Sequence, residues 1–177
     1  MDASPTPISA SEPDWSREKA ERSWDPPRAL LKSIRDYQRY RQQGSAMGAK
    51  LAVVRHRIWS VVTGADIPLN SNLGGGLLIP HPNGVVIHPD AEVGPNCLLF
   101  QQVTIGATSA GVPKLGGHVY VGAGAKIIGP VQIGDHAIIG ANAVVTRNVP
   151  AGATAVGIPA RIVGKAAAPR TRLRGSA

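Results

Sequence analysis

The histidine at position 81 is the residue of this sequence best suited by type and setting to do chemistry. It lies in the segment 'IPHPNG', where a proline on each side restricts the backbone and holds the imidazole at a fixed angle. Histidine is the natural general base for an attacking hydroxyl, because its ordinary pKa lies near 7. Asp66 precedes it by 15 residues. A carboxylate there would fix the imidazole tautomer and stabilise the imidazolium.

The other histidines and the single cysteine give weaker signals. His88, in 'VIHPDAE', has no carboxylate at a comparable spacing, which favours a surface or turn role. His56 falls in a basic segment and His136 at a corner of the repeat described below, so we assign them no chemistry. The role of His118 stays open. Cys97, in 'GPNCLLF', has no basic neighbour in sequence to activate it, which predicts a small core residue.

The elements that must position these residues have a period of six. Aliphatic residues recur at this spacing in three runs, which are Ile67, Leu73, Ile79 and Val85; Ile87, Val93, Leu99 and Ile105; and Val121, Ile127, Ile133, Ile139 and Val145. A helix repeats every 3.6 residues and a strand every 2, whereas a three-sided parallel β-helix places one inward aliphatic on each six-residue side. We therefore predict a mainly β fold, a parallel β-helix solenoid, with an extruded loop where the pattern breaks at 107–118. Asp66 and His81, separated by nearly one full coil of three such sides, would lie on adjacent rungs.

Two short amphipathic helices are predicted before the solenoid. The first, after Pro26 and Pro27, places Leu30, Leu31, Ile34 and Tyr37 on one face. The second ends at Gly64 and carries Met47, Leu51, Val54, Ile58 and Val61 at spacings of three and four. The expected organisation is a disordered or extended N-terminus over 1–24, a helical region over 25–64, the solenoid over 65–164 and a flexible basic tail over 165–177.

Composition supports this organisation and limits the function classes. The 177 residues include 21 glycines and 15 prolines but only 4% aromatics, which suits a turn-rich repeat of small residues. The sequence contains no run of 18 apolar residues, so no membrane span is predicted. The acidic N-terminus lacks the apolar core of a signal peptide. One cysteine cannot form an internal disulfide, which favours a reducing cytoplasm.

The net charge of +8 is concentrated in the segment 28–57 and in the C-terminal tail. No aromatic-interleaved basic motif accompanies it, so a solvated helix face and tail are favoured over a nucleic-acid site. Attraction of an anionic small molecule, such as a phosphorylated cofactor, is a third interpretation.

Two segments resemble the serine O-acetyltransferases of the hexapeptide-repeat acyltransferase superfamily. They are 'GADIPLNSNLGGGLLIPHPNGVVI' and 'VGAGAKIIGPVQIGDHAIIGANAVVTRNVPAGATAVGIPARIVG', and the resemblance covers about residues 62 to 164. It implies a left-handed solenoid, against the usual right-handed crossover, and trimers with active sites at subunit boundaries. It also implies a catalytic dyad of His81 and Asp66 that acetylates L-serine in cysteine biosynthesis.

The resemblance further implies acetyl-CoA as donor. The pantetheine arm would contact the small residues Gly106, Ala107, Ala123, Ala125 and Ala141. The backbone N–H of Gly106 is our candidate oxyanion donor. Arg161 and Lys165 would pair with the nucleotide phosphates.

Several positions depart from the family pattern. Pro80 replaces an aspartate that contacts the substrate amine in the family, and Val112 replaces a second histidine in a loop that is shorter here. Asp25, in 'WDPP', is a candidate acceptor contact. The ending 'RLRGSA' lacks the isoleucine that binds the sulfhydrylase partner in some members, which argues against that complex. The short helical region leaves a lone homotrimer or a dimer of trimers as alternatives.

Three other functions are compatible with a solenoid of this kind. The nearest keeps the chemistry and changes the acceptor to a sugar or other small hydroxyl compound, which Pro80 and Val112 favour. A γ-carbonic-anhydrase-like zinc lyase needs three histidines, of which only His118 lies in the relevant region, so we expect no metal. A non-catalytic trimeric scaffold is the third.

Overall fold

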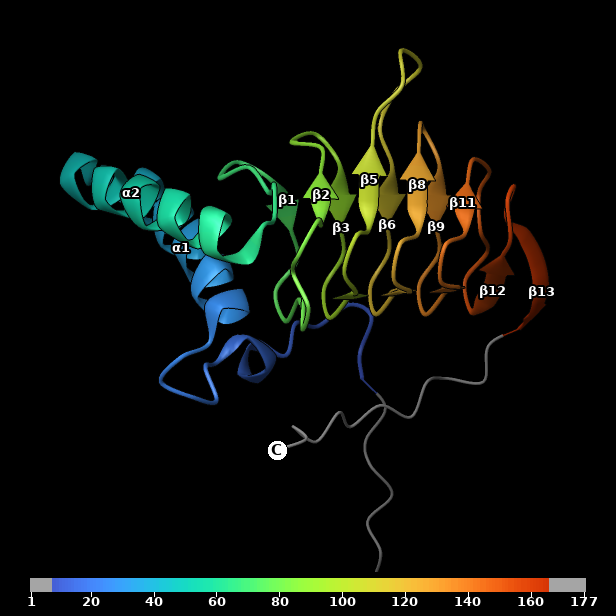
Figure 1. Cartoon of the computed structure of the whole chain (residues 1–177), viewed down its shortest axis with the longest axis horizontal. Coiled ribbons are helices and arrows are strands. Elements are labelled where there is room, and N and C mark those ends of the chain that lie inside the picture. Colours follow the sequence, from blue (N-terminus) through green and yellow to red (C-terminus); the bar gives the residue numbers. More distant parts are fainter. Residues whose placement is uncertain (1–7, 166–177) are drawn as a thin grey trace, which may run out of the picture.

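The computed structural model describes residues 8–165, in which two helices precede a three-sided parallel solenoid (Figure 1). The helical elements are the 3₁₀ helix η1 (Trp15–Glu18), α1 (Pro26–Gln42) and α2 (Ala46–Thr63). The strands are β1 (Asn72–Leu73), β2 (Val86–Ile87), β3 (Glu92–Val93), β4 (Leu98–Leu99), β5 (Thr104–Gly106), β6 (Lys114–Leu115), β7 (Tyr120–Val121), β8 (Lys126–Ile128), β9 (Gln132–Ile133), β10 (Ile138–Ile139), β11 (Val144–Val145), β12 (Ala153–Val156) and β13 (Arg161–Lys165).

The strands form three sheets, one for each side of the prism. The β2 face has the order β2-β5-β8-β11, the β3 face β1-β3-β6-β9, and the β4 face β4-β7-β10-β12-β13. All strand pairings are parallel except the antiparallel β12–β13 hairpin. The predicted parallel β-helix with two N-terminal helices is therefore confirmed.

The predicted six-residue repeat forms the core of the solenoid. All thirteen of its aliphatic residues are at most 7% exposed. Successive rungs stack them in columns, as in the register of Ile87 with Ile105 and of Ile105 with Ile127. A single coil has no second layer to bury its aliphatic residues, so this stacking provides the hydrophobic stabilisation of the fold.

The interruption of the repeat that forms the extruded loop contains fewer residues than expected. Val86 pairs with Thr104, and Thr104 in turn pairs with Lys126, so the coil that carries the loop is four residues longer than the coil before it. β6 resumes the coil at Lys114, so the predicted break over 107–118 is wrong at its end, and the extruded loop is residues 107–113. This loop rises from the solenoid between β5 and β6 (Figure 1).

The predicted disorder of residues 1–24 is wrong for residues 8–24, which pack along the solenoid. Asn96 anchors the segment, because its side-chain amide donates to the carbonyls of Ser9 and Glu12 and its Oδ1 accepts from Asp14 N–H. The Glu18 carboxylate forms an ion pair of 2.9 Å with Arg35 of α1. A composition typical of disorder was overridden by these tertiary contacts. Residues 1–7, the tail beyond residue 165 and its ending 'RLRGSA' lie outside the described residues.

The two helices pack against each other with their apolar residues arranged differently. Leu30, Leu31 and Ile34 of α1 are buried, as their shared face predicts. The apolar stripe of α2 is exposed instead, and α2 packs through its opposite, small-residue face, where Ala49 and Ala52 are buried. The spacing identified which residues share a face but not the direction in which that face points. No helix in the described part of the chain is long and apolar enough to cross a membrane.

Candidate functional site

His81 lies where one coil of the solenoid is longer than the next. Asp66 pairs with Val86 and Val86 pairs with Thr104, so the coil that starts at Asp66 contains two additional residues. The extra length falls in the turn from the β4 face to the β2 face, which we call the His81 corner. Pro80 and Pro82 flank the histidine, and its side chain is exposed. The additional residues lift the imidazole out of the coil, as a base acting on an external substrate requires.

Asp66 lies beside the same turn. Its N–H donates to the carbonyl of Val85 at 2.8 Å, and its carbonyl accepts from the Ile87 N–H at 3.0 Å. Neither the Asp66 carboxylate nor the His81 imidazole makes a hydrogen bond within residues 8–165. The backbone thus brings the two residues of the predicted dyad to one turn, with both side chains available to other groups.

The charge of Asp66 also acts on His56 of α2. Burial lowers the pKa of His56, and the Asp66 carboxylate partly opposes this effect. His56 Nδ1 lies 3.2 Å from Ser33 Oγ of α1, so this histidine joins the two helices.

An aromatic row, His81–Phe100–Tyr120, extends from the candidate base along the solenoid. The ring centroids of His81 and Phe100 are 6.4 Å apart, and those of Phe100 and Tyr120 are 5.3 Å apart. Phe100 and Tyr120 are half-buried. Sequence reasoning missed this row, although the scarcity of aromatics and their separation by about one rung were signals that could have found it.

Gly106 and Ala107 lie at a different corner of the prism. Gly106 ends β5, its carbonyl accepts from the N–H of Gly129 at 3.0 Å, and Ala107 begins the extruded loop. This loop corner follows the β2 face, whereas the His81 corner precedes it. Within one protomer the candidate base and the candidate oxyanion donor therefore lie at opposite ends of the β2 face.

The other three alanines predicted as contacts, Ala123, Ala125 and Ala141, lie along the His81 corner on higher rungs. Ala123 is half-buried and Ala141 is exposed, and the Asn142 N–H donates to the carbonyl of Ala123 at 2.8 Å. Ala125 is fully buried in the core. Its N–H donates to the carbonyl of Gly122 and its carbonyl accepts from the N–H of Thr104, so the main chain of Ala125 is engaged within the solenoid.

The two predicted phosphate-binding residues lie in β13, at the far end of the solenoid. Arg161 lines a hollow of about 230 Å³ together with Arg147. Lys165 is the last residue of β13, and its side chain lies outside the described part. Arg147 was not predicted, because nothing in its local sequence marks it.

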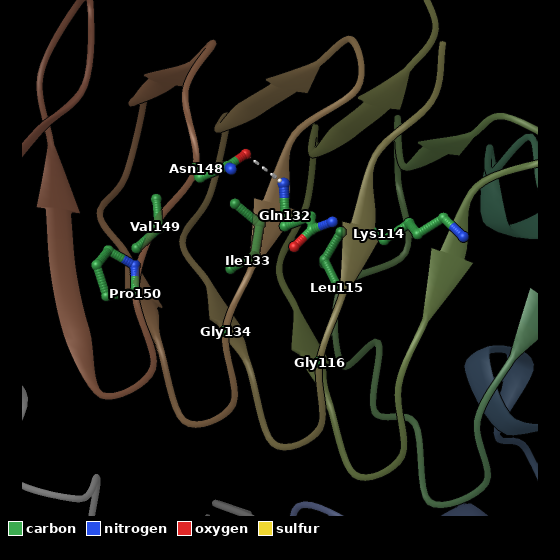
Figure 2. Close-up of a pocket in the computed structure, with 9 residues that line it drawn as sticks. All are labelled: Lys114, Leu115, Gly116, Gln132, Ile133, Gly134, Asn148, Val149 and Pro150. Carbon is green, nitrogen blue, oxygen red and sulfur yellow. Dashed lines mark hydrogen bonds between the residues drawn. The ribbon is translucent and has the colours of Figure 1, made fainter.

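The larger hollow, about 460 Å³, lies on the β3 face. In Figure 2 the Asn148 side chain reaches Gln132, and its Oδ1 accepts a hydrogen bond of 2.8 Å from the backbone N–H of Gln132. The Lys114 side chain points away from both residues. None of the predicted site residues lines this hollow. A shallow hollow without a general base does not replace the His81 corner as the candidate site.

The remaining histidines have local partners. His88 Nδ1 accepts from the Asp90 N–H at 3.2 Å, which closes a surface turn. The rings of His118 and His136 meet edge to face one rung apart at the third corner, with 2.9 Å between their Nδ1 atoms. Burial lowers the pKa of His118, and His136 and Arg17 lower it further. His118 does not lie on the extruded loop.

Cys97 and Asp25 have structural environments. Cys97 is fully buried, and burial raises the pKa of its thiol to about 12, so the predicted core role is confirmed. Asp25 caps α1 and forms an ion pair of 2.8 Å with Arg28. Burial opposes ionisation of Asp25, but hydrogen bonds from Arg28 and the Glu21 N–H outweigh it and lower the pKa. Residues 8–165 contain no cluster of three or more His, Cys, Asp or Glu side chains arranged to hold a metal ion.

Comparison with known proteins identifies relatives of this architecture. Residues 113–147 match the family described as bacterial transferase hexapeptide (six repeats). A serine acetyltransferase of Synechococcus elongatus is 46% identical over 107 residues, which is 58% of this chain and 44% of that protein. The chain spans about half the length of the curated relatives it matches.

Solved structures of serine acetyltransferases are also similar to this chain. A serine acetyltransferase in complex with CoA has a TM-score of 0.68 and 34% identity, covering 79% of this chain and 57% of its own. Soybean serine acetyltransferase complexed with serine has the same TM-score and identity, covering 78% and 57%. The sequence, the solenoid and these similarities agree that the chain is similar to the hexapeptide-repeat proteins named serine acetyltransferases.

Proposed function

We propose that this protein is an acetyl-CoA-dependent O-acetyltransferase that converts L-serine to O-acetylserine, a precursor of cysteine. The observation that carries the proposal is the likeness of the solenoid to serine acetyltransferases solved with CoA and with serine. The exposed His81 beside Asp66 supplies the groups that this reaction needs.

His81 acts as general base. It takes the proton from the serine hydroxyl as the oxygen attacks the thioester carbonyl, and Asp66 stabilises the resulting imidazolium. The N–H of Gly106 donates to the oxyanion of the tetrahedral intermediate. When the C–S bond breaks, the imidazolium returns the proton to the CoA thiolate, so ester and thiol are the products.

The site is completed between subunits of a homotrimer. In one protomer His81 and Gly106 lie at opposite ends of the β2 face, so a single chain does not present base and oxyanion donor to one carbonyl. A neighbour that places its loop corner against the His81 corner would bring them together. Association of two trimers through the helical region is the alternative assembly.

Acetyl-CoA lies along the small residues of the His81 corner and of the loop corner. Ala123, Ala141 and Ala107 leave room for the pantetheine arm, whose amides pair with main-chain groups of the two corners. Arg161 and Lys165 bind the phosphates of the nucleotide, because guanidinium and ammonium groups pair well with phosphate oxygens. The reaction needs no metal.

The acceptor has a second candidate, a sugar or other small alcohol. Pro80 and Val112 offer no charged group to a serine amine or carboxylate. The Asp25 carboxylate is already bound by Arg28. The rings of Phe100 and Tyr120 next to His81 would suit the apolar face of a sugar ring.

Measuring CoA release with L-serine and with a panel of sugars decides between the acceptors. Serine turnover at millimolar concentration supports the proposal. Turnover with a sugar and none with serine would replace the acceptor and keep the chemistry, and no turnover with any acceptor would favour a non-catalytic scaffold. We place the enzyme in a reducing cytoplasm, consistent with its single, buried cysteine, and propose no sulfhydrylase, nucleic-acid or membrane partner.

A further inference from the structure

The second helix carries an apolar stripe that no described residue covers. The stripe consists of Met47, Leu51, Val54, Ile58 and Val61, which are 79%, 57%, 54%, 53% and 84% exposed. The opposite face of α2 contains the buried residues Ala49 and Ala52, and His56 and Arg55 of α2 contact α1. The helix extends from one end of the molecule, away from the solenoid (Figure 1).

The spacing of the stripe is that of a helix–helix seam. Its members follow one another at intervals of four, three, four and three residues, the heptad pattern of a coiled-coil interface. A helix that packs on a globular core usually has a broader apolar face. The stripe is about 21 Å long at 1.5 Å per residue. A partner helix of about four turns would cover it.

Charge identifies the kind of helix that fits. α2 contains Lys50, Arg55 and Arg57 and no acidic residue. Arg55 forms an ion pair of 2.9 Å with Asp36. Lys50 and Arg57 are exposed and make no ion pair within residues 8–165. They are seven residues apart and therefore border the same flank of the stripe.

A second copy of α2 fits this flank poorly. In an antiparallel pair centred on Val54, Lys50 would lie near Arg57 of the other copy. In a parallel pair, Lys50 would lie near the other copy's Arg55. Like charges at these flanking positions oppose pairing, whereas acidic residues favour it.

We propose that α2 is a docking site for an acidic amphipathic helix of a second protein. That helix would carry aliphatic residues at heptad spacing and place Asp or Glu opposite Lys50 and Arg57. The proposal goes beyond the proposed acetyl transfer, since none of these residues has a role in that reaction.

Binding of two synthetic peptides to the full chain tests the proposal. Both peptides carry leucine at the two seam positions of three heptads, and one has glutamate and the other lysine at the flanking positions. In fluorescence anisotropy at low salt, the glutamate peptide should bind at least about tenfold more tightly. The double variant Lys50→Glu/Arg57→Glu should reverse that preference, and Val54→Asp should weaken binding at least about tenfold.

Val163→Asp is the matched control, because Val163 of β13 is 65% exposed and lies outside the stripe. It should bind like the wild type. Circular dichroism and CoA release check that Val54→Asp is folded and active. Equal affinity for both peptides, or unchanged binding by Val54→Asp, would overturn the proposal. A sedimentation mass above that of the trimer, lost in Val54→Asp, would indicate that a second copy binds the stripe and would also overturn the proposal. So would binding to vesicles with anionic phosphatidylglycerol that Val54→Asp abolishes.

Discussion

At the scale of single residues, the site depends on an irregularity in an otherwise regular repeat. The coil from Asp66 to Val86 is two residues longer than the coil from Val86 to Thr104, and His81 lies in its lengthened turn. The flanking prolines limit the conformations of that turn and so hold the imidazole outward. Other histidines, which lie on regular coils or on a helix, are engaged by local partners.

The contact between His118 and His136 predicts how the stability of the protein depends on pH. Because the pKa of folded His118 is lowered, the unfolded chain binds more protons below about pH 6.5. This contribution to stability is present above the unfolded pKa and is lost as the pH falls through the folded pKa. The melting temperature should therefore fall between pH 7 and pH 5.

The variant His118→Asn should flatten this dependence. Asparagine tolerates the positive φ of 53° at this position, and Asn96 adopts 60° on the preceding rung. Some slope should remain, because burial also lowers the pKa of His56. Thermal unfolding of both proteins across this pH range measures the difference, and identical slopes would contradict the explanation.

At the scale of elements, close stacking of coils at the corners requires small residues. A Cβ added to Gly94 would lie 2.4 Å from the backbone carbonyl carbon and oxygen of Gly116 on the next rung. Backbone atoms cannot move aside as a flexible side chain can. The corner can therefore accept a larger residue only if two coils separate.

Gly94→Ala should consequently lower the free energy of unfolding by about 2 kcal/mol or more. Gly164→Ala is the control, because a Cβ at Gly164 meets no atom within 4 Å. It should change stability by less than about 0.5 kcal/mol. Chemical denaturation of the two variants measures the difference. An equally small loss of stability in Gly94→Ala would contradict the close packing of Gly94 against Gly116.

Sequence reasoning found the elements that repeat and missed those set by contacts between distant segments. Thirteen aliphatics at a spacing of six defined the core because each rung imposes the same packing requirement. The ordering of residues 8–24 depends on Asn96, which is far away in sequence, so local composition could not reveal it. The short extent of the extruded loop likewise depends on where β6 pairs again.

The candidate site was predicted in part for the same reason. Asp66 and His81 could be linked through their spacing of nearly one coil. Phe100 and Tyr120 lie next to His81 because successive rungs stack. Those rungs differ in length, so the spacing of the three residues in the sequence does not show that they are neighbours. The outward direction of the α2 stripe follows from how α1 packs on α2, which the periodicity of either helix alone does not determine.

At the scale of the whole molecule, the proposed function requires more than one copy of the chain. The candidate base and oxyanion donor lie at different corners, so we expect a sedimentation mass equal to three 18.4-kDa chains. Mixing His81→Ala with Gly106→Pro, which removes the donor N–H, should restore activity in mixed trimers if the site is shared. A fully active monomer would contradict this assembly.

The most direct test of the account compares the wild type with His81→Asn in steady-state acetyl transfer from acetyl-CoA to L-serine. The exposed imidazole is not part of the core, so the variant should keep its melting temperature and its affinity for CoA. Its kcat should fall at least about a hundredfold, as expected for loss of a general base. A folded variant that binds CoA and retains kcat within about threefold of the wild type would contradict the assignment of His81 as the base.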